Sequence, residues 1–176
     1  MLEATVAGLQ RRGVAGLSFT RVLADSGAAR GAIYHHFPQG KSQLVREAAQ
    51  ANGAQVEAAL ATLTGPTPTA VVERFFDAVR PVLEASANGY GCAVAAVTVE
   101  TDDEDDGHRT AAHTIFTGWA SRVSDALIAA GLNRDEAEDL STYLIGLLQG
   151  AHVLCRAAGT TDPFERIVRS AQRHMP

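Results

Sequence analysis

The residues best suited to chemistry lie in one short stretch, RGAIYHHFPQGK, which runs from Arg30 to Lys41. It brings a guanidinium, a phenol, two imidazoles and the only lysine of the chain close together in sequence. All of these groups can donate hydrogen bonds to phosphate oxygens or to the edges of bases. Their spacing does not match that of a metal site or a catalytic triad. The stretch therefore indicates a surface that binds a polyanion.

The charge of the chain is divided in a way that agrees with this interpretation. The formal net charge is -5, from 15 basic and 20 acidic groups. The first fifty residues hold six of the basic groups and three of the acidic groups, a net charge of +3, so the remainder carries a net charge of -8. An acidic segment is repelled by phosphates, whereas the first fifty residues can bind them. We expect the two parts to have different partners.

The elements that position these residues are expected to be helices throughout. Hydrophobic residues make up 46% of the chain but aromatic residues only 6%, which favours a core of closely packed, alanine-rich helices. Apolar residues recur with a helical period in nearly every segment, and no alternating strand pattern is convincing. The fold class is therefore all-α. About nine helices are expected, near residues 2–12, 18–27, 29–36, 41–63, 69–86, 92–100, 108–130, 133–157 and 162–173.

Two of the short helices flank the DSGA turn at residues 25–28 and follow a supporting helix, which is typical of a helix-turn-helix. Ser18 is suited to cap the first of the two. The second, from about Ala29 to His36, would enter the major groove of DNA with its N-terminal residues at base edges. Ile33 and Phe37 lie four residues apart and would anchor this helix in the core.

The segment GLSFTRVLADSGAARGAIYHHFPQGKSQLV resembles the DNA-binding segment of the TetR family of repressors, and the preceding MLEATVAGLQRRG matches the first helix of that family. The extra residue in FPQGK and the segment GYGCAVAAVTVE at residues 89–100 resemble the LmrA/YxaF branch. One position departs from the pattern, because Ala29 stands where a capping Ser or Thr is common. The absence of this cap lowers the stability of the helix by about 1 kcal/mol. The matching family positions are Leu23, Ala24, Gly27, Gly31, Ile33, Tyr34, His36, Phe37 and Lys41.

The resemblance implies an N-terminal three-helix helix-turn-helix domain at residues 1–46 and a C-terminal helical domain for ligand binding and dimerisation at residues 47–176. It implies a repressor that binds a palindromic double-stranded DNA operator as a homodimer and is released by a small, mostly apolar effector. We expect no cofactor and no enzyme activity. The longest nearly apolar run, residues 143–155, is too short to span a bilayer, and we see no signal peptide, so we expect a cytoplasmic location without membrane contact.

The side chains expected to contact DNA lie in the helix-turn-helix and just after it. Arg30 can reach a guanine edge or a phosphate, and Tyr34 can donate to phosphates. Lys41 begins the next helix, where an ammonium group beside backbone N–H groups would bind a phosphate. The alternative is a three-helix bundle with an ordinary polar surface. The predicted DNA-binding residues are Thr20, Arg21, Arg30, Gly31, Ala32, Tyr34, His35 and Lys41.

The dimer interface is predicted on the long helix near residues 133–157. Its leucines form one stripe, and Gly146 and Gly150 form a second that would let another helix approach closely. Two long helices from each subunit would then make a four-helix bundle. The predicted interface residues are Leu140, Leu144, Gly146, Leu147, Gly150, Ala151 and Leu154.

The effector site is predicted mainly from polar residues that stand alone on apolar helix faces. As a set they suit a mostly apolar cavity with a few hydrogen-bonding points. Taken singly, each is better explained as a core polar residue whose hydrogen bonds are satisfied within the fold. The predicted effector-binding residues are Phe76, Tyr90, Cys92, His113, Phe116, Thr117, Gln149 and His152.

Three other interpretations start from cysteine, histidine and acidic residues. His152 and Cys155 share a helix face and could join Cys92 and His113 in a zinc site, but no local spacing supports it. The run DDEDDGHRTAAH at residues 102–113 mimics a calcium loop, although His113 stands where a bidentate Glu is required. We therefore predict no metal. A small hydrolase or thiol enzyme using Cys92 or Cys155 with a histidine is the alternative function.

Overall fold

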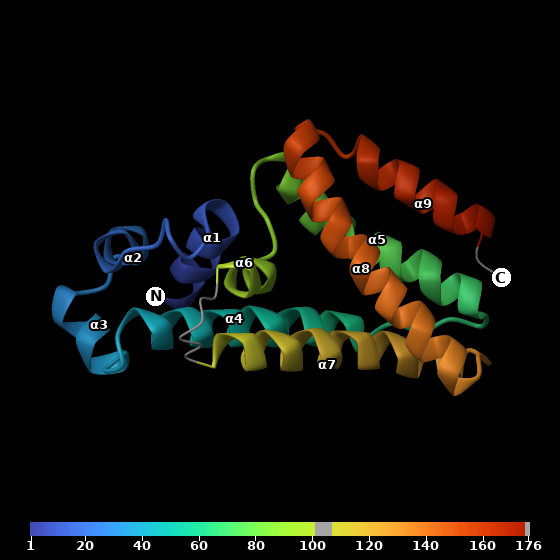
Figure 1. Ribbon diagram of the computed structural model, residues 1–176, viewed down its shortest axis with the longest axis horizontal. Helices are drawn as coiled ribbons and strands as arrows, with labels where there is room; N and C mark the ends of the chain where they lie inside the picture. The colour runs from blue at the N-terminus through green and yellow to red at the C-terminus, as the bar shows by residue number, and fades with distance from the viewer. Residues whose placement is uncertain (101–106, 175–176) are drawn as a thin grey trace. The chain divides into compact units, whose positions relative to one another are not determined.

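The computed structural model describes residues 1–100 and 107–174. The regular secondary structure of these residues is entirely helical, so the all-α prediction is confirmed. None of the described helices has both the length and the apolar character needed to cross a membrane. The helices are α1 (Leu2–Arg12), α2 (Phe19–Ser26), α3 (Arg30–His36), α4 (Lys41–Leu60), α5 (Pro68–Ala87), α6 (Ala93–Val99), α7 (His108–Ala129), α8 (Arg134–Ala158) and α9 (Asp162–His174) (Figure 1).

The helix boundaries follow local capping residues, including Ser18 as expected. The Ser18 hydroxyl accepts a backbone N–H at 3.4 Å at the start of α2, and Gly27 ends that helix with a left-handed φ of 66°. The side chain of Asn133 accepts a backbone N–H at 3.0 Å at the start of α8. α4 ends at Leu60 rather than at Leu63, because the chain then tightens into a turn in which the N–H of Leu63 donates to the carbonyl of Leu60 at 3.1 Å.

The helices form two compact units. Unit 1 comprises Met1–Ala54 and Gly91–Ile115, and unit 2 comprises Gln55–Tyr90 and Phe116–Pro176. α4 and α7 each contribute residues to both units. The predicted division at residue 46 concerns function and remains a prediction.

Unit 1 contains α1, α2, α3, α6 and the first parts of α4 and α7. α1 packs against α2 and α6, and α2 packs against α3. α4 and α7 approach closely where Gly53 faces Ile115, since a Cβ at position 53 would lie 2.7 Å from the Ile115 side chain. By its packing, α6 belongs with the helix-turn-helix. The core consists of Leu9, Leu17, Val22, Ile33, Phe37, Leu44, Val45, Ala48, Ala49, Ala93 and Val97.

Unit 2 contains α5, α8, α9 and the remaining parts of α4 and α7. α8 packs against both α5 and α9, and α5 also contacts α9 (Figure 1). α9 buries Phe164, Val168 and Ala171, whose spacing places them on one helix face. An ion pair between Arg80 and Glu165 joins α5 to α9.

Candidate nucleic-acid interface

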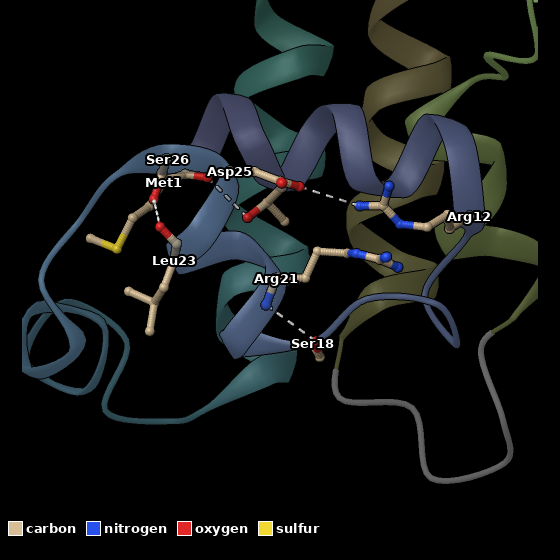
Figure 2. A network of polar contacts seen from close by, with 8 residues as sticks. Met1, Arg12, Ser18, Arg21, Leu23, Asp25 and Ser26 are labelled. Atoms are coloured by element: carbon tan, nitrogen blue, oxygen red, sulfur yellow. Dashed lines mark hydrogen bonds and ion pairs between the residues drawn. The ribbon is translucent and has the colours of Figure 1, made fainter.

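An ion pair holds α2 against α1. Arg12, the last residue of α1, lies 3.6 Å from the carboxylate of Asp25 on α2, and Figure 2 shows the guanidinium reaching it. The Nε atom of Arg12 is buried and has no hydrogen-bond partner among the described residues. Arg12 therefore serves the packing of unit 1, whereas Arg21 on α2 is exposed.

α3 has one buried and one exposed face. Ile33 and Phe37 are 0% and 5% exposed and anchor the helix in the core, as predicted. Tyr34 is 65% exposed, and Arg30 is also at the surface. Ala29 has the extended backbone of an N-cap but makes no capping hydrogen bond with its side chain. The apolar face thus fixes a helix whose polar face is open to a partner.

Phe19 orients the ring of Tyr34. The two ring centroids are 5.7 Å apart and the ring planes meet at 79°, an edge-to-face contact. Such pairs are favourable beyond the area that they bury. Phe19 is the first residue of α2, so the start of one helix supports the exposed phenol of the next. This contact was not predicted, because residues on different helices share no periodic signal.

Side-chain hydrogen bonds fix the turn between α3 and α4. The Gln43 side chain accepts the backbone N–H of Gln39 at 3.0 Å and donates to Glu47 at 2.8 Å. Arg46 donates to the side-chain oxygen of Gln39 at 3.1 Å. Lys41 follows this turn as the first residue of α4 and is partly exposed. The start of α4, and Lys41 with it, is thereby held in place.

Two further contacts within unit 1 come from α6 and α7. The carboxylate of Glu100, which ends α6, accepts the backbone N–H groups of Val14 at 3.0 Å and Ala15 at 2.6 Å. The Nε2 atom of His108, which begins α7, lies 3.1 Å from the carbonyl oxygen of Ser42 and 3.2 Å from its hydroxyl. The α1–α2 connection and the start of α4 are therefore supported by residues far away in sequence.

All eight predicted DNA-binding residues lie in unit 1, on α2, on α3 and at the start of α4. We refer to them below as the recognition residues. Ala32 and Lys41 are partly buried. The exposed ones are Thr20, Arg21, Arg30, Gly31, Tyr34 and His35. The residues that support this surface and were not predicted are Phe19, Gln39, Gln43, Glu100 and His108.

The predicted effector residues are spread over both units. Cys92 and His113 belong to unit 1 and the other six to unit 2. A hollow of about 450 Å³ beside Met1 and His36 contains none of them. Phe76 is 3% exposed and meets the ring of Phe164 edge-on at 6.1 Å, so it fills the core of unit 2 and is not suited to line a site. Among the rest, His113 and Thr117 are exposed and Tyr90, Cys92, Phe116, Gln149 and His152 are partly buried.

A polar cluster lies between α5 and α8. The Nδ1 atom of His152 is 2.7 Å from the hydroxyl of Ser86, which is also 2.9 Å from the carbonyl oxygen of Val82. The roles of Nδ1 and the hydroxyl depend on the imidazole tautomer. Because a carbonyl only accepts, we assign the Ser86 hydroxyl as the donor to Val82 and place the imidazole hydrogen on Nδ1, which then donates to Ser86. Burial lowers the pKa of His152 from 6.5 to about 4, so the imidazole is neutral at pH 7.

The predicted dimer residues lie on two faces of α8. Leu144 and Ala151 are 0% and 1% exposed and pack in the core of unit 2, so their assignment to a surface is corrected. This face of α8 is buried because α8 packs against α5 and α9. Leu140 and Leu147 are partly buried.

The remaining predicted dimer residues belong to an exposed apolar stripe. Tyr143 and Val153, which were not predicted, are 55% and 68% exposed, and Leu154 is 51% exposed. A Cβ at Gly146 or Gly150 would meet no atom within 4 Å. We call this set the α8 stripe, formed by Tyr143, Gly146, Gly150, Val153 and Leu154.

The cysteines and the acidic run give little support to a zinc site, a calcium loop or a thiol enzyme. No group of three or more His, Cys, Asp or Glu that could hold a metal occurs in the part of the chain that the structure describes. The acidic residues of the calcium-like run, 102–106, lie outside that part. The Cys92 thiol accepts a backbone N–H at 3.4 Å and caps α6. Cys155 is 0% exposed, so a substrate has no access to it.

Two family models match this chain. Residues 1–48 match the model described as bacterial regulatory proteins of the tetR family. Residues 68–170 match the model described as the C-terminal domain of LmrA/YxaF-like transcriptional regulators. The second match alone covers more than half of the chain.

Sequence relatives extend over most of the chain. An uncharacterized HTH-type transcriptional regulator of Mycobacterium tuberculosis is 32% identical over 166 residues, which cover 92% of this chain and 84% of the relative. The HTH-type transcriptional regulator LmrA of Bacillus subtilis is 25% identical over 169 residues, which cover 95% of this chain and 90% of LmrA.

Solved structures share the fold. A TetR transcriptional regulator from Legionella pneumophila superposes with a TM-score of 0.86 at 18% identity, covering 99% of this chain and 95% of the other. A cysteine mutant of the TetR family regulator CifR, solved with 26-bp double-strand operator DNA, gives a TM-score of 0.73 at 19% identity, with coverage of 99% and 95%.

Proposed function

Because this chain belongs to the TetR family of transcriptional regulators, with a C-terminal domain of the LmrA/YxaF-like type, we propose that it is a repressor that binds a palindromic operator as a homodimer and is released by a small effector. The observation that carries this proposal is the exposed polar face of α3. Tyr34 is 65% exposed on a helix whose opposite face is anchored by Ile33.

The recognition residues provide both kinds of contact that a DNA reader needs. Arg30 lies at the N-terminal end of α3, where side chains reach base edges in the major groove, and Gly31 beside it lets the backbone come close to the duplex. Tyr34 and Lys41 are suited to bind phosphates and so to set the register of the protein on the duplex. The structural neighbour CifR was solved with double-stranded operator DNA, which supports the same kind of partner here.

A twofold dimer would present two copies of α3 to the duplex. Recognition helices about one DNA turn apart, roughly 34 Å, read a palindromic site. The α8 stripe is the surface best suited to form this dimer, because it leaves large apolar side chains and two unobstructed glycines exposed on one helix. Partner helices can approach closely over glycine.

Release requires that the effector bind one state of the protein better than the other. We assign the effector to unit 2, where Ser86 contacts His152 and where the buried side-chain amide of Gln149 has no partner among the described residues. α4 contributes residues to both units, so a shift of its unit 2 part would move the end that carries Lys41. A coupling of about 1–3 kcal/mol between effector and DNA is typical of such systems.

The test is binding of the purified protein to a DNA fragment from its own promoter, measured by fluorescence anisotropy at several salt concentrations. Tyr34→Ala and Lys41→Ala should weaken specific binding without changing the fold. Lys41→Ala should also reduce the salt slope by about one per subunit, because one phosphate contact is lost. Arg134→Ala is the matched control, since Arg134 is an exposed cation on α8 far from α3 in sequence. Wild-type binding by both recognition variants would refute the docking scheme.

A further inference from the structure

Gln149 is a polar side chain in unit 2 that the fold leaves without partners. Its side-chain nitrogen and oxygen are both buried, and neither forms a hydrogen bond with the residues that the structure describes. An amide in that state costs about as much free energy as a lost hydrogen bond at each end. A group that supplies both a donor and an acceptor would remove that cost.

His152 lies three residues after Gln149, so the two side chains are neighbours on the surface of α8. Its Nδ1 atom is already occupied by Ser86 at 2.7 Å and carries the hydrogen in the tautomer assigned above. The neutral imidazole therefore keeps Nε2 as an acceptor. Together, Gln149 and His152 offer a ligand the two N–H donors of one amide and two acceptor atoms, the amide oxygen and Nε2.

The composition of α8 limits the charge that this helix can balance on a ligand. Residues 140–155 of α8 contain no Asp, Glu, Lys or Arg. Burial holds the pKa of His152 at about 4, so this side chain supplies no positive charge at pH 7. A buried charge without a counter-charge is strongly unfavourable. Carboxylates and ammonium groups are therefore both poorly matched to this part of α8.

We propose that Gln149 and His152 form the polar end of the effector site, and that they recognise a neutral ligand group in which a hydrogen-bond donor stands beside an acceptor, as in a carboxamide. This inference rests on the effector-released repressor proposed above. It adds the chemical class of the effector and the two residues that select it. Gln149 acts as both donor and acceptor toward the ligand, and His152 acts as an acceptor.

The experiment uses three probes that share one ring and differ in charge, namely benzamide, benzoate and benzylammonium. Their binding to the full chain at pH 7 is measured by calorimetry and by the NMR signals of the Gln149 side-chain NH₂. Benzamide should bind at least about tenfold more tightly than either charged probe, the effect of about one hydrogen bond on Kd. It should also shift the Gln149 NH₂ signals.

Gln149→Met tests the residue, because Met has a similar length and lacks the amide. It should weaken benzamide binding at least about tenfold while leaving the unfolding temperature unchanged or higher, since it removes two unsatisfied groups. Gln172→Met is the matched control, because Gln172 is exposed on α9, and it should bind benzamide like the wild type.

Three results would overturn the inference. The first is benzoate or benzylammonium binding as tightly as benzamide. The second is unchanged benzamide binding by Gln149→Met. The third is that none of the probes binds and that the hydrogens of the Gln149 NH₂ exchange rapidly with solvent. That result would mean that the amide is hydrogen-bonded to water and not to a ligand. Promoter binding by the wild-type sample separates the two proposals. If the wild type does not bind its promoter, the repressor proposal is refuted. If it binds the promoter and one of the three results above is found, only the effector inference is refuted.

Discussion

Burial assigns different roles to the histidines of this chain. His35 and His36 are exposed beside Tyr34, where they can donate hydrogen bonds to a phosphate. His152 is partly buried in unit 2 and hydrogen-bonds to Ser86. Histidine is thus an exposed hydrogen-bonding group on α3 and a neutral, partly buried group on α8.

The pKa of His152 predicts a dependence of stability on pH. Burial lowers this pKa from 6.5 to about 4 in the folded chain, so between these values the unfolded chain binds the additional proton. The free energy of unfolding should therefore fall as the pH drops from 6.5 to 4, by at most about 3 kcal/mol at about 1.4 kcal/mol per pKa unit. Above pH 6.5 this contribution is complete.

The measurement is urea unfolding of the wild type and His152→Gln between pH 4 and 8. The difference between the two proteins should shrink toward low pH, because the variant lacks the titrating group. His113→Gln is the control, since His113 is exposed, and its curve should follow that of the wild type. A constant difference between His152→Gln and the wild type would show that His152 is not held neutral by the fold.

At the scale of single elements, local signals predicted the helices well. Ser18, Gly27 and Asn133 define helix ends because capping depends on residues near in sequence. The contact of Glu100 with the α1–α2 connection had no such signal. Periodicity also identified apolar residues on α8 without showing that α5 and α9 cover Leu144 and leave other residues exposed. That distinction depends on packing between distant segments.

The missing cap of α3 predicts a stabilising substitution. Ala29 already has N-cap backbone angles, φ -65° and ψ 141°, so a serine hydroxyl there can accept a free N–H of the first turn. Ala29→Ser should raise the free energy of unfolding by about 1 kcal/mol. Ala24→Ser is the control, because Ala24 is exposed inside α2, where serine cannot cap and only lowers helix propensity. Equal effects of the two changes in urea unfolding would mean that α3 does not begin at Arg30.

Glu100 predicts a link between α6 and the α1–α2 connection. Its carboxylate accepts two backbone N–H groups, from Val14 and Ala15, whereas a carboxamide has only one oxygen. Glu100→Gln should therefore increase hydrogen exchange at one or both of these amides and lower stability by about 1 kcal/mol. Glu84→Gln, at an exposed position of α5, should change neither quantity. Unchanged exchange at both amides in Glu100→Gln would remove α6 from this support.

At the scale of the whole molecule, the proposed function needs two subunits, and the α8 stripe predicts how they meet. Gly150 is exposed, and a Cβ there would touch nothing in its own subunit. Gly150→Leu should therefore keep or raise subunit stability, by up to about 1 kcal/mol from helix propensity. In the dimer the new side chain would hold the partner helix away, so the dimer Kd should rise about tenfold or more. Sedimentation equilibrium measures the dimer Kd, with Ala78→Leu, at an exposed position of α5, as the control.

Promoter binding should weaken together with dimerisation, because one α3 alone reads only half of a palindrome. A Gly150→Leu protein that dimerises like the wild type would place the subunit interface elsewhere.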